Sequence, residues 1–316
     1  MHKKVAIIGG NGFIGSNLSK YLLDKNMKVK VLDKFINKDK ISKTKNSNVK
    51  FIESDITNTA ELINNIGDFE NIIWLVHTSV PSNSMLDLTG DLLANLDPLV
   101  KFLMKIKDTP NIERFIFLSS GGTIYGNPQS PTPINEDHPI NPISNYGITK
   151  YTQEKYINLL LNQSQIQTFI LRPSNVYGPY QNLNKPQGIV GHAFKAATNN
   201  HPINLFDNGQ IIRDFIFVDD LSDAIFQCLN SSSYNASVES YNIGSEIGIS
   251  IKEIINHIET VSEQNIKLIF KPARPFDCNY NVLDCSKFKS NYCWEARTTA
   301  EKGIKTVHDW ILSTNR

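Results

Sequence analysis

Short runs of consecutive apolar residues alternate along the chain with stretches in which apolar residues recur every three or four positions. The runs predict strands, and two of them, 5–8 and 114–120, lack polar–apolar alternation and therefore predict strands buried in the centre of a parallel sheet. The runs lie at residues 5–8, 28–32, 49–53, 71–77, 114–120 and 165–171. The intervening stretches predict helices, such as Asn17 to Leu23, Leu92 to Met104 and Gly188 to Asn199. This alternation predicts an α/β protein whose doubly wound parallel sheet has helices on both faces.

A glycine loop joins the first predicted strand to the first predicted helix. Gly9, Gly12 and Gly15 stand three apart, and Phe13 and Ile14 lie between the last two. Missing Cβ atoms allow a tight turn and let backbone N–H groups approach a pyrophosphate, while the helix N-terminus adds partial positive charge. A turn between two core elements is the simpler alternative. The strand before the loop and the helix after it favour a dinucleotide site.

Acidic residues follow the second and third predicted strands. Asp33 can accept hydrogen bonds from both hydroxyls of an adenosine ribose and would repel a 2′-phosphate, which favours NAD over NADP as the cofactor. It can also be an ordinary helix N-cap. Asp55, followed by Ile56, lies at the edge of the sheet where a doubly wound fold binds its ligand. It can therefore bond the adenine amino group or cap a helix starting near Asn58, and both interpretations stay open.

Composition narrows the class of protein. The 316 residues can form one large core or two of ordinary size, and 32 Lys and Arg against 31 Asp and Glu provide no field that would attract nucleic acid or an anionic membrane. No apolar run approaches the ~20 residues of a membrane span, and the first strand starts too early for a secretory signal. Four cysteines without C-x-x-C spacing favour reduced thiols over a metal site. We expect a cytoplasmic protein without a metal.

Candidate catalytic residues follow the fifth predicted strand, which ends in Ser119 and Ser120. Tyr146 and Lys150 are four residues apart at the start of a predicted helix, so they share a face. The ammonium, together with the positive charge of a bound oxidised nicotinamide, can lower the phenol pKa from about 10 toward neutrality and make Tyr146 a general base. This spacing alone is more often a solvated helix face. Because Tyr146 and Lys150 follow a predicted dinucleotide-binding region, the interpretation as a catalytic pair is favoured here.

With these motifs in register, the sequence resembles the extended short-chain dehydrogenase/reductase family. Within that family it is most similar to the nucleotide-sugar epimerases and dehydratases, above all the UDP-sugar 4-epimerases. The resemblance covers nearly the whole chain, including residues 119–126, 171–179 and 213–220. It implies an NAD-binding Rossmann domain at 1–172, to which 210–230 returns. It further implies a smaller C-terminal α/β domain at 173–316 that binds the nucleotide sugar, and a homodimer formed through a four-helix bundle.

Residue roles follow from the same resemblance. It makes Tyr146 and Lys150 the catalytic pair. Residues implied to lie near the cofactor, besides the glycine loop and the two acidic positions, are His77, Asn95 and Ser119. Residues implied to bind the nucleotide sugar are Asn175, Phe206, Arg213, Arg274, Asp277 and Asn281. The two arginines suit a diphosphate because a guanidinium fork engages its oxygens in pairs. A salt bridge to Asp214 is the alternative for Arg213.

Two positions depart from the family pattern or bear on specificity. Gly121 stands where the family usually has a catalytic Ser or Thr, and Thr123, ahead of Ser120, is the hydroxyl expected to replace it. Asn281 is at a position that gates the sugar pocket, and its small side chain favours N-acetylated sugars as well as simple hexoses. A slip of one residue would place Tyr280 there instead.

The resemblance therefore implies NAD-dependent 4-epimerisation of a UDP-sugar through a transient 4-keto intermediate. A 4,6-dehydratase is disfavoured because Gly121, Gly122 and Thr123 stand where those enzymes have Thr-Asp-Glu, so both carboxylates are missing. A 4-keto-sugar reductase is also disfavoured, because these enzymes usually prefer NADPH and Asp33 favours NAD. A non-catalytic relative that binds NAD or a nucleotide sugar is the third alternative, and Gly121 is the argument for it.

Overall fold

The computed structural model describes residues 3–37, 41, 47–79, 84–183, 188–231, 236–273 and 278–314. The chain forms two compact units. The first unit comprises Met1–Ser120, Ser144–Arg172 and Ser222–Tyr241, and the second comprises Gly121–Ile143, Pro173–Leu221 and Asn242–Arg316. The chain leaves the first unit after Ser120, Arg172 and Tyr241, and it returns to that unit at Ser144 and Ser222.

A seven-stranded sheet forms the centre of the first unit as far as the chain is described, in the order β10-β6-β5-β4-β1-β2-β3. Its strands are β1 (Lys4–Ile8), β2 (Lys28–Asp33), β3 (Val49–Glu53), β4 (Asn71–Trp74), β5 (Arg114–Leu118), β6 (Gln167–Pro173) and β10 (Val238–Ile243). Every pairing among β1 to β6 is parallel. The chain starts in the middle of the sheet, runs to one edge and then continues on the other side of β1. The predicted doubly wound parallel sheet is thereby confirmed.

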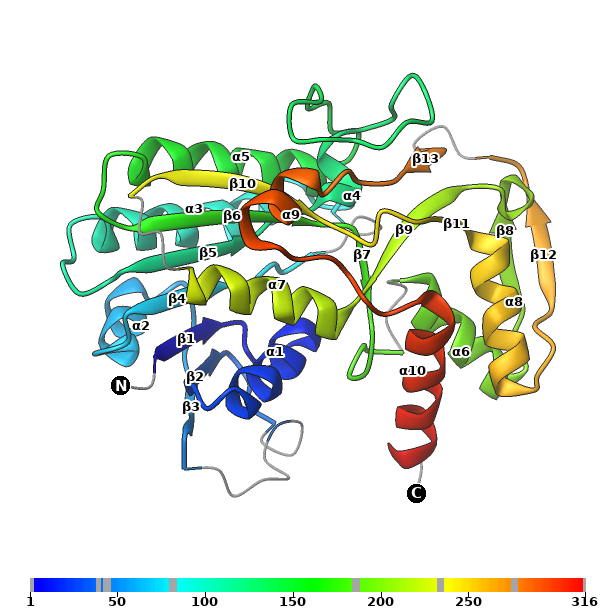
Figure 1. Cartoon of the computed structure of the whole chain (residues 1–316), viewed down its shortest axis with the longest axis horizontal. Helices are drawn as coiled ribbons and strands as arrows, with labels where there is room; N and C mark the ends of the chain where they lie inside the picture. Colours follow the sequence, from blue (N-terminus) through cyan, green and yellow to red (C-terminus); the bar gives the residue numbers. More distant parts are fainter. Residues whose placement is uncertain are drawn as a thin grey trace. The chain divides into compact units, whose positions relative to one another are not determined.

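Helices cover both faces of this sheet (Figure 1). They are α1 (Phe13–Asp24), α2 (Thr59–Ile66), α3 (Leu88–Ile106), α5 (Asn145–Leu161) and α7 (Val218–Asn230). Buried side chains of α2, α3 and α5 form a core with β1, β4, β5 and β6. On the other face, Tyr21 of α1 donates a hydrogen bond to Asp223 of α7 at 2.6 Å.

The fourth strand ends earlier than predicted. We expected it to reach His77, but β4 ends at Trp74. The neighbouring strand β1 ends at Ile8, where the chain turns into the glycine loop. A backbone hydrogen bond from Leu75 N to Ile8 O, at 2.9 Å, lies at this end of the two strands. Because no partner strand continues beyond that point, His77 lies in the loop after the strand.

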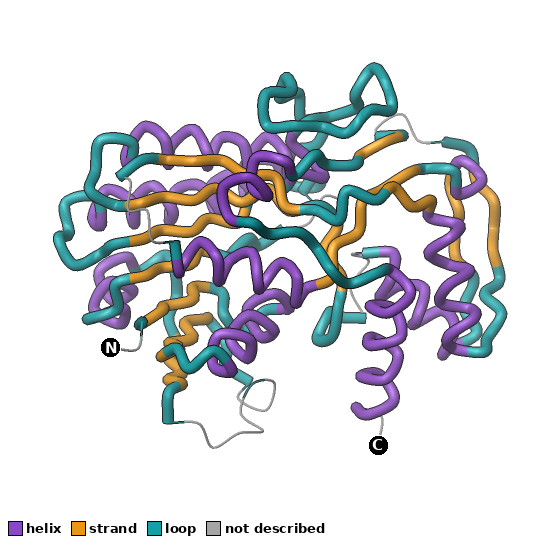
Figure 2. Tube along the Cα trace, viewed as in Figure 1, coloured by secondary structure: helices purple, strands orange, loops and turns teal. Residues whose placement is uncertain are grey.

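Short strands and helices form the second unit (Figure 2). They are α4 (Gly121–Ile124), β7 (Asn175–Tyr177), α6 (Ile189–Asn199), β8 (Ile203–Phe206), η2 (Asp207–Gly209), β9 (Ile212–Phe217), β11 (Gly248–Ser250), α8 (Ile251–Ser262), β12 (Leu268–Lys271), β13 (Tyr280–Asn281), α9 (Ser286–Tyr292) and α10 (Ala300–Thr314). Strand β9 pairs with β7, β11 and β13, and β8 pairs with β12. Apolar side chains of α6, α8 and α10 form the core of this unit.

Candidate active site

The glycine loop has the shape that a bound pyrophosphate requires. Gly9 has a φ of 81°, a conformation that side-chain-bearing residues rarely adopt, and its N–H donates to Leu32 O at 2.8 Å. Gly12 is the N-cap of α1 and makes no side-chain capping bond. A Cβ at Gly15 would lie 2.5 Å from a backbone atom of the loop, whereas one at Gly12 would meet a single atom, at 3.3 Å. Gly15 is therefore required for packing, and Gly12 leaves space beside the helix N-terminus.

Asp33 lies beside this loop. It is the last residue of β2, and one of its carboxylate oxygens accepts a hydrogen bond from Asn11 N at 2.9 Å. The described residues that follow, 34–37, are not helical, so the alternative that Asp33 is a helix N-cap is wrong. A side-chain-free cradle with an acidic residue next to it fits a dinucleotide with an unsubstituted ribose, such as NAD.

Asp55 does not cap the helix that follows. Asn58 is the N-cap of α2, and its side chain accepts a hydrogen bond from Glu61 N. Asp55 instead accepts hydrogen bonds from the N–H and hydroxyl of Thr57, and it lies 3.1 Å from Lys34 Nζ. These contacts, the Thr57 N–H first, lower the pKa of Asp55. Contact with adenine stays a prediction.

Tyr146 and Lys150 both lie on α5, one turn apart. The helix starts at Asn145, with Ser144 as its N-cap. Lys150 Nζ donates to Leu118 O at 2.8 Å and lies 5.9 Å from the centre of the Tyr146 ring. Burial lowers the pKa of Lys150 to about 7, although the carboxylates of Glu154 and Asp91 favour its charged form.

The expected fall in the pKa of Tyr146 does not occur in the protein alone. Burial raises the pKa of this phenol, and the Asp91 carboxylate raises it further. The prediction gave weight to the lysine charge and could not include burial. The phenol of Tyr146 is therefore protonated at neutral pH in the protein alone.

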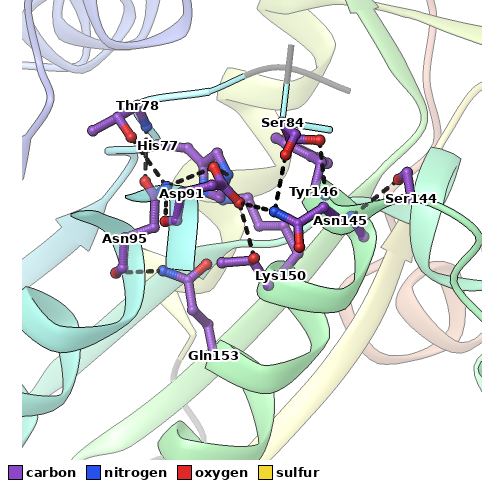
Figure 3. Close-up of polar contacts among 12 residues, drawn as sticks. His77, Thr78, Ser84, Asp91, Asn95, Ser144, Asn145, Tyr146, Lys150 and Gln153 are labelled. Carbon is purple, nitrogen blue, oxygen red and sulfur yellow. Dashed lines mark hydrogen bonds and ion pairs between the residues drawn. The ribbon is translucent and has the colours of Figure 1, made fainter. Parts of the chain in front are cut away.

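A network of polar side chains supports the pair (Figure 3). Asn95 accepts a hydrogen bond from Thr78 N at 2.8 Å, and Gln153 of α5 donates to Asn95 O at 2.9 Å. The His77 ring contacts the Tyr146 ring edge-on, with 4.5 Å between the ring centres. Both ring nitrogens of His77 are buried without a hydrogen-bond partner in the described part of the chain. Burial, with a smaller effect of Lys150, lowers the pKa of His77 to about 2.

The serines at the end of β5 differ in their surroundings. Ser119 Oγ donates to Glu154, and Ser119 N donates to Leu171 O at 2.7 Å. Ser119 therefore fixes the strand end to its neighbours, as expected for a structural residue. Ser120 is partly buried. In the second unit, Thr123 Oγ1 is buried and has no hydrogen-bond partner among the described residues.

Three of the predicted substrate residues lie on β7, β8 and β9. Asn175 Nδ2 donates to Asp214 O at 2.9 Å, and Phe206 is the half-buried last residue of β8. Arg213 donates to Ile212 O at 2.9 Å. The salt bridge considered between Arg213 and Asp214 is disfavoured, because successive side chains of a strand point to opposite faces. Asp214 is fully buried and its carboxylate accepts hydrogen bonds from Ser174 and Ser245.

Of the remaining predicted substrate residues, Asn281 is the last residue of β13. Arg274 and Asp277 are outside the described residues. Asn281 is buried, its Nδ2 donates to Gly121 O at 3.1 Å, and its Oδ1 has no partner in the described part of this unit. The residue proposed to gate the sugar pocket is thus bonded to the residue that replaces the family hydroxyl.

Sequence reasoning missed several side chains of the network in Figure 3, among them Asp91, Asn145 and Gln153. A signal was present: Asp91 and Asn95 are four residues apart on the apolar face of α3, where polar side chains need a partner.

No helix among the described residues is long and apolar enough to cross a membrane. The same residues contain no group of three His, Cys, Asp or Glu side chains that could hold a metal ion.

Comparisons with known proteins agree with this geometry. Residues 5–244 match the family described as "NAD dependent epimerase/dehydratase family". A putative UDP-glucose 4-epimerase of Methanocaldococcus jannaschii is 30% identical over 99% of both chains. A dTDP-4-dehydro-6-deoxyglucose reductase of Escherichia coli is 28% identical over 95% of both. The structure of a UDP-glucose 4-epimerase of Thermotoga maritima with UDP-glucose has a TM-score of 0.87 and 26% identity, over 99% of this chain and all of that one.

Proposed function

Because the chain belongs to the NAD-dependent epimerase/dehydratase family, we propose that it inverts carbon 4 of a UDP-sugar, with NAD as its retained cofactor. The observation that carries the proposal is the placement of Tyr146 and Lys150 on one helix, in the same unit as the glycine loop and Asp33. The Thermotoga maritima enzyme, which holds UDP-glucose, supports the substrate class. The resemblance inferred from the motifs is confirmed at the level of the family.

Tyr146 acts as the general base in this proposal. Its phenolate removes the proton of the 4-hydroxyl group and returns a proton to the 4-keto sugar after the sugar has turned over. The glycine loop and Asp33 would hold NAD, which would supply reversible hydride chemistry at carbon 4 of the sugar. Lys150, held by Leu118 O, supplies positive charge near the phenol. The buried phenol needs that charge, because burial alone raises its pKa.

The second unit provides the proposed contacts to the nucleotide sugar. Thr123 is the better candidate for the hydroxyl missing at Gly121, because its Oγ1 is buried and unpartnered in the described part of the unit. Asn175, Arg213, Arg274 and Asp277 are proposed to bind the diphosphate, and Phe206 the base. Asn281 is proposed to admit N-acetylated sugars.

The test is incubation of the purified protein, without added cofactor, with UDP-glucose and UDP-N-acetylglucosamine in parallel, followed by NMR of the products. The 4-epimer is expected from each, and Tyr146→Phe should lose turnover while keeping bound NAD. Activity on UDP-glucose alone would contradict the role of Asn281. No epimer from either sugar would contradict the proposed reaction, and substantial activity of Tyr146→Phe would contradict the proposed base.

A 4-keto-sugar reductase is the second candidate, since the Escherichia coli relative is named a dTDP-4-dehydro-6-deoxyglucose reductase. It predicts net consumption of a reduced nicotinamide, whereas an epimerase needs none to be added. Asp33 at the end of β2 favours the epimerase because it suits NAD. A 4,6-dehydratase or a non-catalytic relative would give, respectively, a 4-keto-6-deoxy product or no product.

We also propose a homodimer formed through α3 and α5. Large apolar side chains are exposed on these two helices, namely Leu88, Leu93 and Met104 on α3 and Ile148 and Leu159 on α5. Two such helix pairs together would form a four-helix bundle, which removes these side chains from water. A cytoplasmic location is proposed as well, in keeping with four free cysteine thiols.

A further inference from the structure

A buried carboxylate lies between α3 and the start of α5. Only 3% of the Asp91 side chain is exposed. One of its oxygens accepts hydrogen bonds from Asn145 Nδ2 at 2.8 Å and Thr149 Oγ1 at 3.0 Å. The other accepts from Asn95 Nδ2 at 3.0 Å and lies 3.8 Å from His77 Nε2 (Figure 3). Asp91 therefore binds Asn145, one residue before Tyr146 on α5, and Thr149, three residues after it, as well as Asn95, which accepts a hydrogen bond from the loop after β4.

The charges around the catalytic pair balance only when Asp91 is included. Glu154, one turn beyond Lys150, is already paired with Arg172 at 2.7 Å. His77 is neutral above about pH 2, so it does not compensate the negative charge of Asp91. Lys150 is the remaining buried cation, and Asp91, after Glu154, favours its charged form. A buried charge without compensation is costly, so this pairing has a physical basis even without direct contact.

We infer that Asp91 is a positioning residue for the proposed epimerisation: its carboxylate holds the first turn of α5, and its negative charge acts on Tyr146 and Lys150. The inference rests on the proposed function. Hydrogen bonds to Asn145 and Thr149 fix the part of the helix that carries the phenol. The charge makes removal of a proton harder from both members of the pair.

The sign of the electrostatic effect is the same for both groups. A nearby negative charge favours the protonated form of a phenol and of an ammonium, and Asp91 raises the pKa of Tyr146 and of Lys150. Turnover needs Tyr146 deprotonated, so the acid limb of the pH profile follows the phenol once the positive charge of the bound cofactor has lowered its pKa. It also needs Lys150 protonated, so the alkaline limb follows the ammonium. Removing the charge should therefore move both limbs to lower pH. Loss of packing alone would lower the rate and leave the limbs in place.

The experiment compares Asp91→Asn with Thr149→Val. The first removes the charge at nearly constant shape, and the second removes one hydrogen bond to Asp91 and keeps the charge. With UDP-glucose as substrate, both limbs of kcat should shift by about 1 pH unit to lower pH in Asp91→Asn. Thr149→Val should lower kcat without a shift. Unmoved limbs in Asp91→Asn, or an equal shift in Thr149→Val, would overturn the inference.

A second measurement does not depend on turnover. The protein is labelled with 15N at lysine Nζ and followed by NMR as the pH is changed. The signal of Lys150 is the one that is absent from the spectrum of Lys150→Met, and its shift with pH reports the titration of Lys150. It should titrate near pH 7 in the original protein and at lower pH in Asp91→Asn. If no UDP-sugar is converted, the proposed function fails while this titration still decides the role of Asp91. If Lys150 titrates at the same pH in the original protein and in Asp91→Asn, the inference is overturned. Asp91→Ser, which also removes the charge, replaces Asp91→Asn if that variant does not fold.

Discussion

Glu154 and Arg172 form a buried ion pair that fixes α5 to β6 of the sheet. Arg172 donates to the two carboxylate oxygens at 2.7 and 3.1 Å, and the side chains are only 7% and 2% exposed. Ser119 donates to the same carboxylate. Glu154→Gln keeps the shape of the side chain and removes its charge, so it leaves Arg172 as an uncompensated cation in the interior.

The expected magnitude follows from the burial. Removing one partner of a buried ion pair lowers the free energy of unfolding by about 3–5 kcal/mol, whereas an exposed pair contributes about 0–1 kcal/mol. Helix α3 provides a matched control: Lys101 and Asp97 are 2.8 Å apart, and their side chains are 59% and 48% exposed. Asp97→Asn should therefore cost only about 0.3–0.5 kcal/mol.

Urea unfolding followed by circular dichroism measures both losses. With a slope of about 3 kcal/mol/M, the midpoint should fall by about 1 M or more in Glu154→Gln and by about 0.2 M or less in Asp97→Asn. Because Glu154 lies one turn after Lys150, we also expect the first variant to have a lower kcat. Equal, small losses of stability would refute the reasoning that burial, rather than distance, sets the strength of the pair.

Two further predictions concern the cofactor loop and the subunit interface. Gly15→Ala would place a Cβ 2.5 Å from the backbone of the loop and should lower both thermal stability and NAD affinity, whereas Gly12→Ala should weaken NAD binding by about tenfold with nearly unchanged stability. Calorimetric titration with NAD checks this, and unchanged affinity in Gly12→Ala would count against the loop as the pyrophosphate site. Leu159→Asp on α5 should give a monomer in size-exclusion chromatography, while Leu312→Asp on α10, which is also exposed, should remain dimeric. A dimer in both variants would contradict the proposed interface.

The central strands β1 and β5 could be predicted because they are buried on both faces and therefore lack alternation. The bounds of β2 and β3 agree with the prediction within one residue, although β3, at the edge of the sheet, contains no buried residue. The end of β4 could not be predicted, since it depends on where the partner strand stops. The same holds for 121–143, which belongs to the second unit through contacts with distant residues, such as Ile134 N to Val282 O at 2.9 Å.

Candidate residues were predicted from spacing, but their surroundings were not. Tyr146 and Lys150 lie one turn apart as expected, yet the pKa of the phenol is raised because burial is a tertiary property. The contacts of Asp91 arise from the packing of α3 on α5, which bring together residues more than fifty positions apart. Asn281 and Gly121 are 160 positions apart and could be linked only by the fold.

The late return of the chain to the first unit has a consequence for synthesis on the ribosome. Strand β10 borders β6, and Ser237 O accepts a hydrogen bond from Thr168 N at 2.9 Å. Until residues 222–241 have emerged, β6 is an uncovered edge strand, and α7 is missing from its face of the sheet. A nascent or truncated chain that ends at Arg172 is therefore open to pairing with other chains. Folding of this unit must wait for about three quarters of the polypeptide, so chaperone dependence should fall sharply once that length is passed.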